Sequence, residues 1–345
     1  MTALKNCWYL AGWGHEFAKG ALTPVMILGE PIVIYRGETG AAHALEDRCP
    51  HRHAPLSKGR IEGEDVRCMY HGIRFGPDGR CTELPGQEVI PKAVFARRYS
   101  AVEKHGGVWI WMGDAAAADA GLVPDFVGPD SDEWAVQAGS IDINADAQLL
   151  IDNLLDVSHA SYVHERTFGR GVAHNVARMV EAELAATTTD LPRGVRVERW
   201  IFGRTGTPGI PEGQATDDFA LNEVNAPGVF TLWTRSYPAG QDRAGGAPAQ
   251  TPLLARFVGQ IITPVRAGKC TLFYAAGPWR AHAHLREDFF ATVTRAFHED
   301  EDIIVAQQKI IDLGGARPML TLRMDAPLKR YELVTRRLAG AEAAV

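Results

Sequence analysis

Two short segments of the chain each pair a cysteine with a histidine. The first segment holds Cys49 and His51, the second holds Cys68 and His71, and 16 residues separate the two segments. Thiolates and imidazoles are common protein ligands of transition metals. The two segments together can therefore supply two thiolates and two imidazoles to one metal site.

This donor set is that of a Rieske [2Fe–2S] cluster, in which two cysteines bind one iron and two histidines bind the other. The neutral imidazoles raise the reduction potential, so the cluster can take an electron from an ordinary ferredoxin and pass it on. A structural zinc site uses the same donors and is the alternative. Zinc fingers usually pair Cys with Cys and His with His along the chain, whereas each pair here is mixed. His53 is a second candidate for the position of His51, but the shorter spacing favours His51.

A second group of polar residues lies in ADAQLLIDNLLDVSHASYVHE, where leucines recur at helical spacing. Asp152, Asn153, Asp156, His159 and His164 all fall in this segment. An ideal helix separates residues five apart by about 140°, so joint metal binding by the two histidines requires a helix end or a local π-type widening. Two histidines and one carboxylate form the facial triad of non-haem Fe(II) oxygenases. A structural role for the two histidines is the alternative.

The segment DNLLDVSHASYVH resembles the Asp-Asn-Leu-x-Asp-x-x-His-x-x-x-x-His sequence of Rieske non-haem iron oxygenases. The stretches NCWYLAGW, PHRHAPLSKG, LPGQ and VWIWMGD resemble the branch that contains the vanillate and dicamba O-demethylases. The resemblance is dense over the first part of the chain and returns at the helical segment and near the carboxy terminus. Residues 170–255 carry little of it.

The resemblance implies roles for several residues of the helical segment. His159 and His164 would bind a mononuclear iron, and Asp156 would join His71 of the partner subunit to His159. An acid that accepts imidazole N–H groups orients both rings. This arrangement implies a head-to-tail ring, a homotrimer. Asn153 would lie beside the iron, where it either positions water or dioxygen or merely stabilises the helix.

The third iron ligand is expected in a late helix. Relatives take an aspartate from a position upstream of a Phe-x-Glu-Asp and Gln-Gln pattern, which appears here as FHEDEDIIVAQQ. This predicts Asp288 as the third ligand, with its neighbour Glu287 as the rival. Asp300 and Asp302 belong to a run of acids and are expected to form a solvated face.

The remaining sequence predicts elements that would position these groups. With 345 residues, 46% of them apolar, the chain is long enough for two domains. PVMILGEPIVIYR, RFGPDGRC and GVWIWM read as short strands, and an Ala-rich stretch before Pro124 marks a change of composition. The prediction is an α+β protein. Residues 1–118 would form an all-β Rieske domain, and residues 119–345 a helix-grip catalytic domain with an antiparallel sheet and helices.

Within the second domain, VFTLWTRSY, ARFVGQIITPV and CTLFYAAG read as strands, and REDFFATVTRAFHEDEDIIVAQQKIIDL reads as a long amphipathic helix. Two long Gly/Pro-rich loops, at Gly203 to Asp217 and Pro238 to Pro252, interrupt the strands. Four aromatic residues are expected either to line an aromatic-substrate pocket or to belong to the core: Trp233, Phe273, Tyr274 and Trp279.

Charge and cysteine usage limit the partners. A formal charge of −6 argues against nucleic acid and anionic membranes. The amino terminus shows no signal-peptide pattern and no apolar run is long enough to span a bilayer, which predicts a cytoplasmic protein. The cysteines outside the cluster are expected to form no disulfides.

The resemblance implies the terminal oxygenase component of a multicomponent monooxygenase. It would use O2 and NADH-derived electrons to hydroxylate or oxidatively O-demethylate an aromatic substrate. The chain has no dinucleotide fingerprint, so a separate ferredoxin or NADH-dependent reductase must deliver the electrons. An acidic partner is expected to dock on a basic rim around the cluster, which consists of Arg52, Lys58, Arg60, Arg67 and Arg74.

Three alternatives remain open at this point. The same iron could perform aromatic-ring dihydroxylation or N-dealkylation. A Rieske electron carrier would explain the cluster but not the second pair of histidines, and a zinc-stabilised binding module would contain no iron. The sequence assigns no arginine that binds a carboxylate, so it does not decide whether the substrate is an acid.

Overall fold

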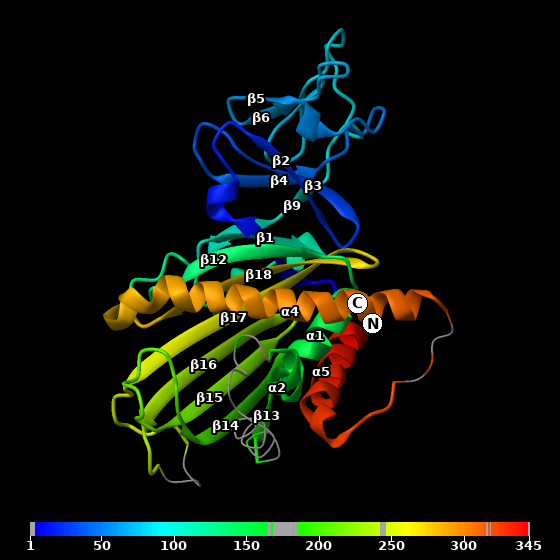
Figure 1. The fold of residues 1–345 in the computed structure, drawn as a ribbon. Helices are drawn as coiled ribbons and strands as arrows, with labels where there is room; N and C mark the ends of the chain where they lie inside the picture. The colour runs from blue at the N-terminus through cyan, green and yellow to red at the C-terminus, as the bar shows by residue number, and fades with distance from the viewer. Residues whose placement is uncertain are drawn as a thin grey trace. The chain divides into compact units, whose positions relative to one another are not determined.

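The structure is a computed structural model, which describes residues 4–164, 167, 182, 185–241, 246–314, 317 and 319–343. The chain divides into two units, which are described separately (Figure 1). One unit consists of Lys5–Val123 with Thr263–Ala267, and the other contains most of the residues from Pro124 onward. Across the described ranges, no helix combines the length and the apolar character needed to cross a membrane.

The amino-terminal unit is built from three small antiparallel sheets. In the first sheet the strands pair in the order β1 (Cys7–Trp13), β11 (Gly107–Met112) and β10 (Ala101–Lys104). In the second sheet the order is β2 (Leu22–Ile27), β3 (Glu30–Arg36), β4 (Ala42–Glu46) and β9 (Arg98–Tyr99). In the third sheet it is β5 (Arg60–Glu62), β6 (Asp65–Arg67), β7 (Arg74–Phe75) and β8 (Cys81–Glu83). Short 3-10 turns lie between them, at Gly14–Glu16, Leu56–Lys58, Ala115–Ala117 and Ala120–Leu122.

The predicted strands of this unit are confirmed. PVMILGEPIVIYR forms the hairpin of β2 and β3, and RFGPDGRC forms that of β7 and β8. Every residue of β11 is buried, as expected for a continuous apolar run. The loops that carry Cys49 and Cys68, the cysteine loops, pack on a hydrophobic core that contains Leu45, Leu56, Val66 and Phe75.

The other unit contains a seven-stranded antiparallel sheet. Its strands pair in the order β12 (Gln137–Ile143), β18 (Lys269–Pro278), β17 (Leu254–Arg266), β16 (Val229–Pro238), β15 (Thr216–Asn225), β14 (Gly194–Arg204) and β13 (Thr187–Leu191). The helical elements are α1 (Ala147–Leu155), η5 (Val157–His159), α2 (Ala160–Val163), η6 (Arg280–Leu285), α4 (Arg286–Asp312), η7 (Arg323–Asp325) and α5 (Ala326–Ala343). The predicted α+β class, the predicted strands and the predicted late helix are confirmed.

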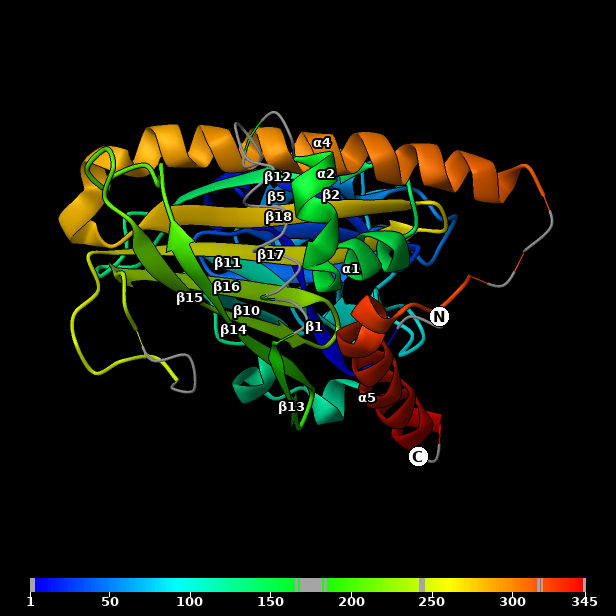
Figure 2. The same cartoon turned by 60° about the horizontal axis from the view of Figure 1, so that its bottom comes forward.

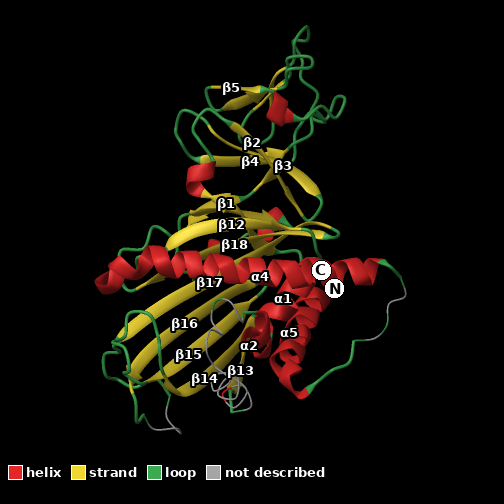
Figure 3. Ribbon diagram, in the orientation of Figure 1, coloured by secondary structure: helices red, strands yellow, loops and turns green. Residues whose placement is uncertain are grey.

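The helices cover one face of this sheet, as Figures 2 and 3 show. Side chains alternate between the two faces of a strand. Val224, Phe230 and Ile262 belong to the core cluster that also contains Leu155 of α1 and Ile304 of α4. The helix-covered face of the sheet is therefore the face that carries Val224, Phe230 and Ile262.

The two neighbouring isoleucines of α4 provide a test of this packing. Ile304 is 1% exposed and belongs to the core, whereas Ile303 is 52% exposed. Ile304→Ala leaves a cavity and is expected to lower the free energy of unfolding by about 2–5 kcal/mol. The same substitution at Ile303, with the same helix propensity change, is expected to cost no more than about 1 kcal/mol. Urea denaturation of the two variants measures the difference, and equal losses would contradict the packing.

Candidate metal centres

The two cysteine loops of the amino-terminal unit have the same backbone hydrogen bonds. The N–H of Cys49 donates to the carbonyl of Ala54 at 2.8 Å, and the N–H of Cys68 donates to the carbonyl of Ile73 at 2.8 Å. In each loop the cysteine carbonyl also accepts the N–H of the residue four positions later. The two loops are thus equivalent in backbone structure, although their sequences differ.

This equivalence separates the two candidate histidines of the first loop. His53 occupies the turn position that Gly72 occupies in the second loop, and both residues have a positive φ, 58° and 78°. The ring of His51 instead lies next to that of His71, with 4.5 Å between the ring centroids. The geometry supports His51 and His71 as the paired imidazoles.

The environment of the four donors fits an iron–sulfur cluster. Cys49 and Cys68 are 2% and 1% exposed, while His51 and His71 are exposed. Burial, together with the neighbouring Cys68, raises the pKa of the Cys49 thiol to about 11. A bound metal favours the thiolate and offsets this cost. The donors therefore suit a cluster with buried sulfur ligands and surface-exposed imidazole ligands.

The helical segment that carries the second pair of histidines is broken. Helix α1 ends at Leu155, and Asp156 follows with an extended backbone, φ −99° and ψ 91°. A 3-10 turn and the four-residue helix α2 come next. This break brings the rings of His159 and His164 to 5.2 Å between centroids. The helix end that the spacing of the two histidines requires is present.

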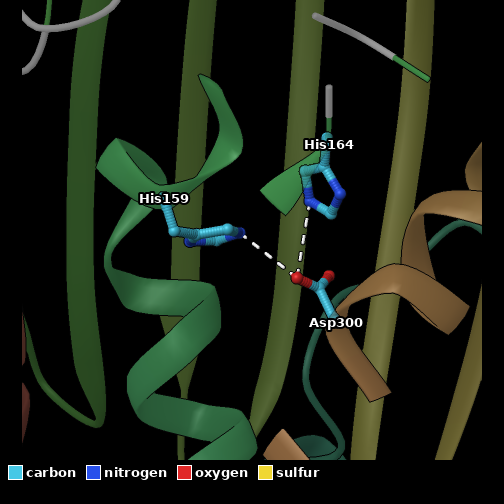
Figure 4. Close-up of side chains that lie close together, drawn as sticks. All are labelled: His159, His164 and Asp300. Atoms are coloured by element: carbon cyan, nitrogen blue, oxygen red, sulfur yellow. Dashed lines mark ion pairs between the residues drawn. The ribbon is translucent and has the colours of Figure 1, made fainter. Parts of the chain in front are cut away.

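The two histidines meet an aspartate of α4 (Figure 4). The Nε2 atom of His159 lies 3.4 Å from Oδ1 of Asp300, and the Nε2 atom of His164 lies 3.5 Å from the same oxygen. One donor atom from each of the three residues lies within 4.8 Å of the others. Asp300 and His164 are 3% and 5% exposed. Two imidazole nitrogens and one carboxylate oxygen converge as in a facial-triad metal site.

The carboxylate that meets the two histidines belongs to Asp300 and not to Asp288, which the sequence predicted. Asp288 is exposed in the first turn of α4, as is Glu287. Asp288 precedes Asp300 by 12 residues, which corresponds to about 18 Å along the helix axis. The structure therefore contradicts Asp288 as the third donor. The expectation of a solvated face is wrong for the buried Asp300. It holds for Asp302, which is exposed.

The second nitrogen of each ring also has a partner. His159 Nδ1 contacts the backbone carbonyl of Asp156. His164 Nδ1 lies 3.1 Å from Oε2 of Glu299, and that oxygen accepts a hydrogen bond from the Thr167 hydroxyl at 2.8 Å. Such contacts fix the orientation of metal-binding imidazoles. The sequence did not predict Glu299 or Thr167; the position of Glu299 next to Asp300 was the available signal for Glu299.

Asn153 and Asp156 lie close to this site. The amide of Asn153 donates to Oδ1 of Asp300 at 3.3 Å. The carboxylate of Asp156 accepts the N–H of Ser158 at 2.9 Å through Oδ1.

Burial alone would lower the pKa of His159, but the hydrogen bond and charge of Asp300 outweigh it, so the pKa of His159 is raised. The carboxylate of Asp300 thus favours positive charge at this site, which suits a metal cation.

The aromatic residues expected at a substrate pocket lie elsewhere. Trp233 packs against Phe257 and Trp134, on the sheet face opposite the histidines because Phe257 precedes the core residue Val258. Trp279 contacts the same Trp134. These rings form a core on the other face of the sheet, so the pocket prediction is wrong for them.

The other two aromatic residues of that prediction are neighbours on β18. Phe273 stands between the core residues Leu272 and Tyr274 and therefore faces away from the helices. Tyr274 faces the helices but stacks on Phe290, and its hydroxyl lies 3.0 Å from that of Thr294. Tyr274 is 3% exposed. Both residues belong to the core, which was the alternative.

The basic rim around the cysteine loops is partly neutralised. Three of its five members form ion pairs with acids of the same small sheet: Arg60 with Glu62, Arg67 with Glu62 and Glu83, and Arg74 with Asp65. Arg52 and Lys58 are exposed. The basic excess is therefore smaller than the sequence suggested and centres on Arg52 and Lys58.

Comparisons with known proteins identify two families along the chain. Residues 7–94 match the Rieske [2Fe-2S] domain family, and residues 143–341 match the vanillate O-demethylase oxygenase C-terminal domain family. The chain is 34% identical to the toluene-4-sulfonate monooxygenase system iron-sulfur subunit of Comamonas testosteroni over 98% of both chains. It is 30% identical to the vanillate O-demethylase oxygenase subunit of Pseudomonas sp. (strain HR199 / DSM 7063), over 98% of this chain and 95% of that one.

Solved structures show the same fold. The crystal structure of dicamba monooxygenase bound to dicamba superposes with a TM-score of 0.80, covering 99% of each chain at 24% identity. The two chains therefore share one fold, an all-β unit followed by an antiparallel sheet with helices.

Two aspartates of α4 offer a direct test of the second site. Asp300→Ala removes the carboxylate that both histidines face, so the purified protein is expected to lose about one iron per chain while it keeps its iron–sulfur spectrum. Asp288→Ala, in the same helix, is expected to keep the full iron content. Iron and acid-labile sulfide analysis of the two variants provides the measurement. Unchanged iron in Asp300→Ala would contradict the site.

Proposed function

Because the chain belongs to the Rieske non-haem iron oxygenases with a vanillate O-demethylase-type catalytic domain, we propose that it hydroxylates or oxidatively O-demethylates an aromatic substrate. It is the terminal oxygenase component of a multicomponent system and uses a [2Fe–2S] cluster and a mononuclear iron. The observation that carries the proposal is the coexistence of two donor sets. An electron carrier would need only the cysteine loops, whereas this chain also converges two histidines on a buried aspartate.

The division of labour follows the two halves of the chain. We propose residues 1–118 as the Rieske domain and residues 119–345 as the catalytic domain; the two family matches, residues 7–94 and 143–341, fall within these ranges. In the first, Cys49 and Cys68 would bind one iron of the cluster, and His51 and His71 the other. The exposed imidazoles would be the route by which electrons pass in and out.

The electrons come from a separate component, since the relatives are subunits of multicomponent systems. We propose that a ferredoxin or reductase with an acidic surface docks near Arg52 and Lys58. Both side chains are exposed on the unit that carries the cysteine loops. Opposite charges steer the encounter of two proteins more than they tighten the complex.

In the catalytic domain, His159, His164 and Asp300 would hold the mononuclear Fe(II) and leave its other positions open. When bound, the iron would activate dioxygen, with one oxygen atom entering the substrate and the other leaving as water. The Asp156 carbonyl and Glu299 hold the imidazoles with both Nε2 atoms directed at Asp300. Asn153 would act as a positioning residue through its hydrogen bond to the Asp300 carboxylate.

The reaction has two simple forms. Hydroxylation of an aryl methyl group gives an alcohol, and hydroxylation of a methoxy group gives a hemiacetal that collapses to a phenol and formaldehyde. The related subunits are named for toluene-4-sulfonate, which carries a methyl group, and vanillate, which carries a methoxy group. These two compounds are the first substrates to test.

The test is oxygen uptake by the metal-loaded protein with NADH and a reductase that reduces its cluster. At least one of toluene-4-sulfonate and vanillate is expected to stimulate uptake and to yield a hydroxymethyl product or formaldehyde in proportion to the NADH consumed. Without substrate, uptake should stay low. If the reduced enzyme turned over none of a broad panel of aromatic methyl and methoxy compounds, the proposal would be wrong.

We further propose that Asp156 connects the two metal sites of neighbouring subunits in a homotrimer. Its carboxylate is half-buried beside the break in the helix, and only one of its oxygens accepts a hydrogen bond from a described residue, the N–H of Ser158. Its own carbonyl contacts His159. A carboxylate in this place would accept the N–H of His71 of the partner subunit and give the electron a short path.

Asp156→Asn tests this path. The amide keeps the shape of the side chain but loses the charge that attracts an imidazole N–H, so turnover is expected to fall by about 100-fold with both metals retained. Asp152→Asn, one turn earlier in α1, is the matched control and should leave turnover nearly unchanged. Iron content and the rate of cluster reoxidation separate a lost electron path from lost metal. Normal turnover in Asp156→Asn would contradict the bridge.

A further inference from the structure

The helix-covered face of the catalytic sheet carries a row of residues with an arginine at each end. The strand register aligns Arg199 of β14 with Ala220 of β15, Ala220 with Thr234 of β16, and Thr234 with Arg256 of β17. Residues aligned across an antiparallel sheet point to the same face. Two arginines thus flank two short side chains in one row.

This row lies on the same face as the candidate iron site. Arg256 is two residues from Val258, which packs against the helix-covered core, so both side chains point to that face. Phe297 and Ile304 of α4 belong to that core and flank Asp300 on the same side of the helix. In Figure 4 the strands of the sheet pass behind the two histidines and Asp300. The arginines and the metal donors therefore share one side of the sheet.

Two arginines share one carboxylate in this part of the face. Arg256 Nη2 lies 3.3 Å from Oδ2 of Asp218 and 3.3 Å from the hydroxyl of Ser236. The same oxygen of Asp218 lies 3.1 Å from Arg204 Nη1. One carboxylate is thus shared by two arginines. Arg199, at the other end of the row, donates to the side chain of Asn222 at 2.7 Å.

Arg256 is incompletely satisfied for a buried cation. It is 9% exposed, and its Nε is buried with no hydrogen-bond partner among the residues that the structure describes. Burial lowers the pKa of Arg256 to about 10, although Asp218 opposes the shift. Burying a charged group without full compensation is costly, so such groups commonly serve a ligand of opposite charge. An oxyanion would supply the acceptor that Nε lacks.

We propose that Arg256, with Arg199 on the other side of the row, binds the anionic group of an aromatic sulfonate or carboxylate. The proposal rests on the proposed function and names the class of its substrate. Three strand spacings separate the two arginines, about 14 Å between Cα atoms, and the side chains between them are only Ala220 and Thr234. A planar guanidinium from each end can reach a trigonal or tetrahedral oxyanion over these small residues.

The test compares acids with neutral compounds of the same shape. Toluene-4-sulfonate and toluene-4-sulfonamide form one pair, and 4-methylbenzoate and 4-methylbenzamide form the other. Calorimetric titration of the metal-loaded protein under anaerobic conditions is expected to show at least one acid binding about 10- to 100-fold more tightly than its amide. Arg256→Met is expected to remove this preference. The pair with the larger difference tells whether a sulfonate or a carboxylate is preferred.

Two further variants separate binding from folding. Arg204→Met removes the other arginine that contacts Asp218, and is expected to change the preference for the acid by no more than about threefold. Arg256→Lys keeps the charge without the planar fork, so it should fold like the wild type and retain part of the preference. Circular dichroism melting curves show whether each variant is folded.

The proposal is overturned if the wild-type protein binds acids and amides equally, if it binds neither acid, or if folded Arg256→Met keeps the full preference. Binding is measured without turnover, so its outcome is independent of the oxygen-uptake experiment. Tight binding of an acid that is not oxidised would support Arg256 as an anion-binding residue and count against the proposed reaction. Turnover of neutral aromatics without tight binding of an acid would support the proposed reaction and count against Arg256 as an anion-binding residue.

Discussion

The catalytic half of the molecule depends on one interruption of a helix. His159 and His164 are five residues apart and would point in different directions on a straight helix. The extended backbone of Asp156 redirects the chain and brings their rings together. The interruption also releases the carbonyl of Asp156 from the helical pattern, and this carbonyl then contacts Nδ1 of His159. The same break thus positions one histidine and orients its ring.

The two sets of metal donors sit in contrasting environments. At the cysteine loops the sulfur atoms are buried and the imidazoles are exposed, which suits the exchange of electrons with another protein. At the second site His164 and Asp300 are almost completely buried, and Glu299 and Asn153 hold them by hydrogen bonds. A site that activates dioxygen benefits from such a fixed and largely dry environment. The difference in burial matches the difference in proposed task.

Local patterns in the sequence predicted the parts of the sites whose donors are close together in the chain. Cys49 with His51, Cys68 with His71, and His159 with His164 are all visible as short spacings. Asp300 was missed because it sits in a run of acids, and only the helix phase, with Phe297 and Ile304 on the same side, separates it from them.

Features that depend on strand register could not be predicted from the sequence. Trp233 and Phe273 have the composition of a pocket lining, but each faces away from the histidines because a strand alternates its sides at every residue. The row that joins Arg199 to Arg256 requires the register of four strands to be known. A register error of one residue reverses the face on which every side chain of a strand lies, so the sequence alone does not determine these positions.

The matching backbone of the two cysteine loops bears on how the protein acquires its cluster. Each loop is closed by its own main-chain hydrogen bonds, from Cys49 to Ala54 and from Cys68 to Ile73, and none of these bonds involves a metal ligand atom. Beneath them, Leu56, Val66 and Phe75 form an apolar support that is likewise independent of iron. These contacts support the loops without using a metal-ligand atom, so they would reduce the conformational entropy that the loops lose when a cluster binds.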